Sequence, residues 1–293
     1  MSASPSEFAA AVERWLTADP RVRVAILFGS SARTQHEHAT ADDWSDLDLH
    51  VVTTDAAALE HVNWPEALPA QEFCFQAVRP ATGGVRKATV LFKTGQLDLV
   101  LVPLSRLKLG RLALRLGFHR KSGPVRSAFN EINTCIRSGY RFLKGEAEWG
   151  GFYARIAGEM SGVRLSDDEA IQRAGVSLCD ALWILQKLER GELAAAQHLL
   201  HRSLAETNFA LVRELRLRRG EPLPSFGLGR RVETLLPPHE LAWVRIDARL
   251  HHAELKAAVS RALQGLAALM AELVPAWRVP PEMAALFERA ARS

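Results

Sequence analysis

Cysteine is scarce in this chain of 293 residues, and the three that occur, Cys74, Cys135 and Cys179, lie far apart without a CxxC pair. This spacing argues against a disulfide framework and against a structural zinc site. Long apolar runs are absent as well, since no stretch approaches the roughly 20 residues that span a bilayer, and no basic segment followed by an apolar run marks a leader. We therefore expect a cytoplasmic protein without a membrane partner.

The chain also has little excess charge of either sign. It carries 37 basic and 33 acidic residues, a formal net charge of +4. An imbalance this small predicts no obligatory nucleic-acid partner. Hydrophobic residues make up 48% of the chain, which is enough for two domains that each bury a core of their own.

The first part of the chain has the apolar patterning of strands. These patterns cover residues 24–28, 47–52, 72–78, 87–93 and 96–102, with a helical stretch at 55–68. Only Thr94-Gly95 separates the last two strands, which predicts an antiparallel hairpin, while the helix predicts a crossover connection. We expect residues 1–104 to form an α/β domain with a mixed sheet.

After Pro103 the strand signals stop and the patterns become helical. Helices are predicted at 106–117, 124–145, 150–160, 168–190, 192–219 and 239–273. Residues 105–293 are therefore expected to form a C-terminal helical bundle domain. We interpret the arginine-rich run at 213–219 as a solvated helix end, and we expect any surplus apolar helix face to form a homodimer seam.

The most informative segment is residues 27–52, where one strand ends in Gly29-Ser30 and the next begins at Asp46-Leu47-Asp48. Glycine permits a sharp turn whose successive N–H groups form an anion site, and the serine hydroxyl adds a donor. Residues two apart on a strand point to the same face, so Asp46 and Asp48 present their carboxylates together. Such a pair beside a phosphate cradle suits Mg²⁺, which takes one or two protein carboxylates and fills its other positions with water and phosphates.

A third carboxylate, Asp98, lies in the otherwise apolar run 97–102. An aspartate in a core strand is expected to be paired, hydrogen-bonded or bound to metal, because a buried charge without a partner is costly. A neighbouring strand that carries Asp46 and Asp48 would supply a shared cation.

These residues resemble the nucleotidyltransferase fold of the DNA polymerase beta type, and within it the bacterial aminoglycoside nucleotidyltransferases of the streptomycin 6-adenylyltransferase group. Gly29 and Ser30, then Asp46 and Asp48, then Asp98 follow the order of the family's signature, which covers roughly the first 104 residues. The resemblance implies that the three aspartates are catalytic and hold two Mg²⁺ ions, and that Gly29 and Ser30 bind the nucleoside triphosphate.

The helical half is similar to the same group at Tyr140-Arg141-Phe142-Leu143-Lys144-Gly145-Glu146. This similarity would make Lys144 a contact of the triphosphate, a role that suits a flexible ammonium. The general base stays open among Asp98 and three helical carboxylates, which are Glu131, Glu159 and Asp180.

Two features depart from the family pattern. Fifteen residues separate Ser30 from Asp46, and this long loop contains His36 and His38, which we interpret as polar loop residues and not as zinc ligands. Residues 122–293 hold 23 basic and 20 acidic residues, whereas a pocket for a polycationic aminoglycoside should be rich in carboxylates.

The sequence thus predicts an adenylyltransferase-like enzyme. It would transfer a nucleotidyl group, AMP from ATP, to a hydroxyl of a small-molecule acceptor and release pyrophosphate. The alternative is a non-catalytic nucleotidyltransferase-like module, such as a toxin–antitoxin component or a nucleotide-sensing scaffold. The intact set of three aspartates favours the enzyme.

Overall fold

The chain divides into two compact units in a computed structural model that describes residues 5–32, 41, 45–81, 84–121, 123–221 and 232–292. The units are Met1–Val163 and Arg164–Ser293, here termed unit 1 and unit 2. Unit 1 contains the sheet and its covering helices, whereas the described residues of unit 2 contain helices and no strand.

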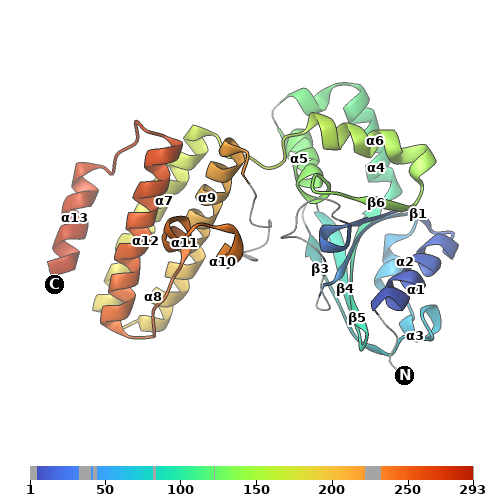
Figure 1. Ribbon diagram of the computed structural model, residues 1–293, viewed down its shortest axis with the longest axis horizontal. Coiled ribbons are helices and arrows are strands. Elements are labelled where there is room, and N and C mark those ends of the chain that lie inside the picture. The colour runs from blue at the N-terminus through green and yellow to red at the C-terminus, as the bar shows by residue number, and fades with distance from the viewer. Residues whose placement is uncertain are drawn as a thin grey trace. The chain divides into compact units, whose positions relative to one another are not determined.

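Unit 1 is built on a mixed six-stranded sheet with the strand order β3-β4-β5-β2-β1-β6 (Figure 1). The strands are β1 (Val22–Phe28), β2 (Leu47–Thr53), β3 (Phe73–Ala81), β4 (Val85–Phe92), β5 (Gly95–Pro103) and β6 (Arg141–Lys144). Strands β2 and β5 pair in parallel, and the other neighbouring pairs are antiparallel. The predicted mixed sheet and its β4–β5 hairpin are therefore confirmed.

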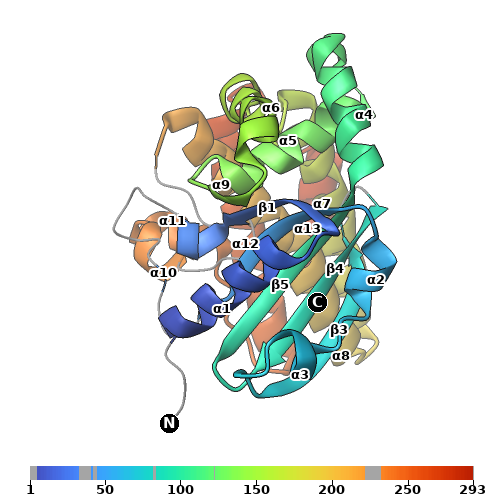
Figure 2. The ribbon, with the colours of Figure 1, turned by 90° about the vertical axis from the view of Figure 1, so that its right-hand side faces the viewer.

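Helices cover both faces of this sheet because its central strands alternate apolar side chains to either side. On one face lie α1 (Pro5–Ala18), α2 (Ala56–Glu60) and α3 (Trp64–Ala67) (Figure 2). Ala25 and Leu27 of β1 join the core on that face. Val24 and Ile26 join a second core, formed with α4 (Leu104–Arg115), α5 (Pro124–Ile136) and α6 (Glu146–Glu159).

Strand β6 corrects the prediction of one helix over 124–145 and of no strand after Pro103. Helix α5 ends at Ile136, and two glycines with positive φ, Gly139 at 127° and Gly145 at 84°, bracket the strand. Between them Phe142 packs edge-to-face on the ring of Tyr153. The glycine breaks and the pairing with β1 therefore override the helical propensity of this segment.

Unit 2 confirms the predicted helical bundle, with different breaks. Its helices are α7 (Asp167–Glu189), α8 (Leu193–Leu199), α9 (Glu206–Arg219), α10 (Val232–Leu235), α11 (Pro238–Val244), α12 (His252–Leu273) and α13 (Pro281–Arg292). Helix α12 packs beside α7 and α9 (Figure 1). A π-helical turn at Leu200–Ala205 joins α8 to α9, and the stretch predicted as one helix at 239–273 is divided into α11 and α12.

The arginine-rich run at 213–219 is a solvated helix end only in part, because Arg218 and Arg219 are exposed while Arg216 is not. Arg216 is buried and binds Glu240 at 2.7 Å, and the Glu240 side chain is 1% exposed. Arg218 binds Glu214 at 3.1 Å, and the Glu214 side chain is 2% exposed. The carboxylates of Glu214 and Glu240 are thus buried in unit 2, and each is compensated by arginines of α9.

The boundary between the units falls later than the 104/105 boundary expected from the sequence. Helices α4, α5 and α6 belong to unit 1 because their apolar residues, Phe129 and Trp149 among them, share a core with Val24 and Ile26 of the sheet. Acceptor binding by the segment 105–293 stays a prediction. In the described part of the chain, no helix is both long and apolar enough to cross a membrane.

Candidate active site

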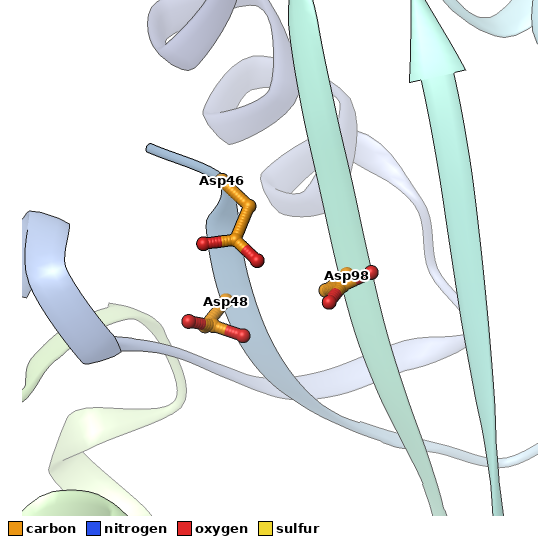
Figure 3. Close-up of side chains that lie close together, drawn as sticks. All are labelled: Asp46, Asp48 and Asp98. Atoms are coloured by element: carbon orange, nitrogen blue, oxygen red, sulfur yellow. The ribbon is translucent and has the colours of Figure 1, made fainter. Parts of the chain in front are cut away.

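Three carboxylates meet at the centre of the sheet. Asp46 immediately precedes β2, Asp48 lies on β2, and Asp98 lies on β5 (Figure 3). The parallel register pairs Asp48 with Asp98, so both side chains leave the sheet on the same face. Each aspartate offers an oxygen that lies within 4.8 Å of the oxygens of the other two. The sheet therefore brings together the three residues that the sequence singled out.

This cluster is partly withdrawn from water. The side chain of Asp98 is 4% exposed and that of Asp48 is 22% exposed. Like charges this close repel one another, and burial raises the cost of each ionised group. The arrangement is therefore stable with all three groups ionised only when a cation lies among them.

A cation from the chain itself, which the sequence motifs do not include, lies at this cluster. Lys87 of β4 forms an ion pair with Asp98 Oδ2 through its Nζ, which is also 4.0 Å from Asp48 Oδ1. In the antiparallel β4–β5 pairing, Thr89 stands opposite Asp98 and Lys87 stands opposite Val100. Lys87 is thus a diagonal neighbour of Asp98, a separation that a long side chain spans.

The Gly29-Ser30 turn lies against the same carboxylates. Gly29 follows β1 with φ of +74°, and a Cβ built on it would lie 2.3 Å from Asp48 Oδ2. The backbone can approach Asp48 so closely because glycine has no side chain. Ser31 Oγ donates to the Asp46 carbonyl at 3.3 Å, which links the turn to the start of β2.

Two buried hydroxyls beside the cluster lack a partner among the residues that the structure describes. They are Ser30 Oγ, on a residue that is 6% exposed, and Thr89 Oγ1, on the residue opposite Asp98. Buried hydroxyls normally find a hydrogen-bond partner. Carboxylate and hydroxyl oxygens are hard donors of the kind that Mg²⁺ and its phosphate ligands prefer, so the residues at this place fit a metal–triphosphate group.

Lys144 is held away from the carboxylates by another contact. Its Nζ donates to the carbonyls of Thr17 at 2.9 Å and Asp19 at 2.8 Å, at the end of helix α1. Desolvation by burial lowers the pKa of Lys144, and the charge of Asp19 opposes that shift. The ammonium thus caps a helix C-terminus, where cations are favourable. Contact of Lys144 with a triphosphate stays a prediction.

The candidate general bases differ in their surroundings. Glu159 binds His119 and Arg155, and the Arg155 guanidinium is the main cause that lowers the pKa of Glu159 to about 2. Asp180 belongs to unit 2 and accepts a hydrogen bond of 2.5 Å from Ser203 Oγ. The low pKa of Glu159 disfavours proton uptake near neutral pH.

Glu131 on α5 is different. Desolvation by burial raises its pKa. Cys135, one turn further along α5, has a pKa raised first by desolvation and then by the charges of Asp48 and Glu131. The charge of Asp48 thus acts on Cys135 of α5, and Glu131 lies one turn before Cys135 on that helix. The loop residues His36 and His38 lie outside the described residues.

Comparisons with known proteins give fold likenesses of low identity. No protein-family model matches the chain, and no curated protein matches it. An aminoglycoside 6-adenyltransferase from Bacillus subtilis is 13% identical with a TM-score of 0.37, and the match covers 99% of this chain and 98% of that one. A nucleotidyltransferase-like protein from Exiguobacterium sibiricum 255-15 is 12% identical with a TM-score of 0.30, over 92% of this chain and 76% of that one.

At such identities and scores a likeness says nothing about the reaction of this chain. The chemistry rests on the residues of the site itself.

Proposed function

We propose that this protein is a Mg²⁺-dependent nucleotidyltransferase that transfers a nucleotidyl group, AMP from ATP, to a hydroxyl of a small-molecule acceptor. The observation that carries the proposal is the meeting of Asp46, Asp48 and Asp98 on two paired strands, within 4.8 Å of one another. The close approach of the Gly29 turn to Asp48 supports it, because a triphosphate bound to the metal needs backbone donors beside the carboxylates.

The proposed roles follow from the positions of the residues. Asp46 and Asp48 would hold the metal ion, which when bound would neutralise the triphosphate and the charge that develops in the reaction. The N–H groups of the turn at Gly29 and Ser30 would orient the phosphates. The acceptor oxygen forms a bond to the α-phosphorus while the bond to the bridging oxygen of pyrophosphate breaks. The protein mainly positions the reactants in line.

The acceptor proton requires a base, and among the three helical carboxylates the raised pKa of Glu131 favours that residue. A carboxyl group whose pKa is raised by desolvation accepts a proton near neutral pH more readily than one held low by an arginine. Glu159 is therefore a poor candidate. Glu131→Gln should depress the rate most at low acceptor concentration and should leave metal binding unchanged.

Replacing Asp48 by Asn tests the proposal. The substitution keeps the shape of the side chain but removes a charged ligand, and we expect pyrophosphate release to fall by at least about 100-fold. The assay supplies Mg²⁺ and each of four nucleoside triphosphates against a panel of hydroxyl-bearing acceptors. Asp247→Asn is the matched control, because the side chain of Asp247 is 74% exposed and lies in unit 2. Equal rates for Asp48→Asn and wild type would refute the assignment.

One observation favours the non-catalytic alternative, a toxin–antitoxin component or nucleotide-sensing scaffold. The ion pair of Lys87 with Asp98 satisfies the most buried carboxylate without any metal. A protein of this kind would show no Mg²⁺-dependent thermal shift with any triphosphate and would retain a stable protein partner in a pull-down. A shift that needs both Mg²⁺ and triphosphate supports the enzyme. A cytoplasmic location and a homodimer also remain proposals.

A further inference from the structure

The ion pair between Lys87 and Asp98 differs from an ordinary surface salt bridge. The side chain of Lys87 is 21% exposed and that of Asp98 is 4% exposed. Lys93, which directly follows the same strand, pairs with Glu72, and those two side chains are 64% and 65% exposed. Exposed pairs contribute little to stability, whereas a lysine is withdrawn from water only where a carboxylate compensates its charge. Lys87 therefore belongs to the acidic cluster and compensates part of its negative charge.

The position of the ammonium coincides with one that a metal ion would need. Lys87 Nζ contacts Asp98 Oδ2 and is 4.0 Å from Asp48 Oδ1. A divalent ion shared by Asp48 and Asp98 would need the same space between their oxygens. The two cations would also repel each other strongly at such a distance in a partly desolvated site. Lys87 and a metal ion on Asp98 therefore exclude one another.

The surroundings of Asp46 differ from those of Asp98. No ion pair with Asp46 occurs in the described part of the chain, and its neighbour Ser31 contacts only the Asp46 main-chain carbonyl. The Gly29 turn approaches Asp48 on Oδ2, whereas Lys87 lies nearer to Oδ1. The two oxygens of Asp48 thus face different neighbours, with the turn at one and the ammonium at the other.

We propose that Lys87 is a resident cation that takes the place of a second metal ion, so that the centre binds one divalent ion, on Asp46 and Asp48. This inference rests on the proposed function and changes the expectation of two Mg²⁺ ions that the family resemblance implies. Asp98 then positions the Lys87 ammonium and is not a ligand of a second ion. One fixed positive charge beside the metal remains available to the phosphates of the substrate.

The number of Mn²⁺ ions bound per chain tests the inference, and this measurement requires no catalytic turnover. Mn²⁺ is titrated into the full-length protein with a non-hydrolysable ATP analogue, and the free ion is measured by electron paramagnetic resonance. We expect one ion per chain for wild type. Lys87→Met should bind two, and its first ion should bind at least about tenfold more tightly because a neighbouring positive charge is gone.

Two further variants control for charge and for folding. Lys87→Arg keeps the positive charge and should keep one ion. Lys93→Met makes the same change in the exposed pair on the same hairpin and should also keep one ion. Thermal melts monitored by circular dichroism show that each variant is folded before titration. Two ions on wild type, or one ion of unchanged affinity on folded Lys87→Met, would overturn the inference.

The titration separates failure of the inference from failure of the proposed function. A wild-type protein that binds one ion, gains a second in Lys87→Met and yet turns over no nucleotide supports Lys87 as resident cation and refutes the transferase. A protein that transfers nucleotide with two ions on wild type supports the transferase and refutes the role of Lys87. Absence of Mn²⁺ binding in both wild type and Lys87→Met refutes both.

Discussion

Replacing Gly29 by alanine perturbs the acidic cluster through the backbone that leads to it. Gly29 has φ of +74°, and a Cβ there would lie 2.3 Å from Asp48 Oδ2 and 3.1 Å from Asp48 Cγ. Ordinary contacts of a Cβ begin near 3.4 Å. Either the turn or the Asp48 carboxylate must therefore move by roughly 1 Å. A displacement of this size at a reacting centre typically causes a large loss of catalytic rate.

The substitution has two effects of different size. The left-handed backbone costs roughly 1–2 kcal/mol for a residue with a Cβ, and alanine regains about 0.4–1 kcal/mol of that by restricting the unfolded chain. The free energy of unfolding should thus fall by about 1 kcal/mol from the backbone alone. The displacement of Asp48 should in addition reduce the transfer rate by roughly 100-fold and weaken Mn²⁺ binding.

Gly117 provides a matched control in the same unit. Its φ is +76°, and a Cβ there would meet nothing within 4 Å. Gly117→Ala should therefore show the backbone cost without the collision. The assays are urea unfolding, Mn²⁺ titration and pyrophosphate release on both variants. The reasoning is refuted if Gly29→Ala and Gly117→Ala lose the same stability while both bind Mn²⁺ and react as wild type does.

The remaining predictions concern the buried ion pairs of unit 2. Glu240→Ala should lower the free energy of unfolding by roughly 3–5 kcal/mol, because it removes the buried carboxylate that pairs with both Arg216 and Arg219. Glu221→Ala removes a 37% exposed partner of Arg216 and should cost less than about 1 kcal/mol. Urea unfolding at neutral pH compares the two variants. Burial opposes the shift, but hydrogen bonds from Arg164 and other donors hold the pKa of Glu214 below its ordinary value of 4.5. The folded state therefore binds fewer protons than the unfolded state, so this stabilisation is complete above pH 4.5 and is lost as the pH falls through the folded pKa. The free energy of unfolding, measured from pH 6 downward, should fall less steeply with decreasing pH in Glu214→Gln than in wild type. An unchanged slope would contradict the assignment.

The features of the candidate site that could be predicted from the sequence are those fixed by local patterns. Asp98 interrupts an apolar run, where a charge must be compensated, and Asp46 and Asp48 stand two residues apart at the start of a strand, which places them on one face. The strands themselves follow from alternating apolar residues. In the structure the turn is Lys93-Thr94 and Phe92 pairs with Gly95, which sets Thr89 opposite Asp98. A turn at Thr94-Gly95 would instead set Leu91 opposite Asp98, so the predicted hairpin does not place Lys87 at the cluster.

The remaining features depend on contacts between distant segments. Strand β6 is only four residues long, and its pairing with β1 brings together segments more than 100 residues apart. The ion pair of Arg216 with Glu240 joins two helices, and a run of arginines at a helix end gives no sign of it. Tertiary packing decides such features, and propensity alone favours the helix and the solvated end.

The parallel pairing of β2 with β5 also bears on how the chain folds. The hairpin of β4 and β5 closes through a turn of two residues, whereas Asp48 and Asp98 meet only after 50 residues of chain have been looped out. Contacts of such separation form late, because the entropy of loop closure must be overcome first. The carboxylates therefore begin to repel one another only as the sheet closes. Lys87 reaches Asp98 from this hairpin, so we expect its charge to be in place before Asp48 arrives and to lower the electrostatic barrier to closing the sheet.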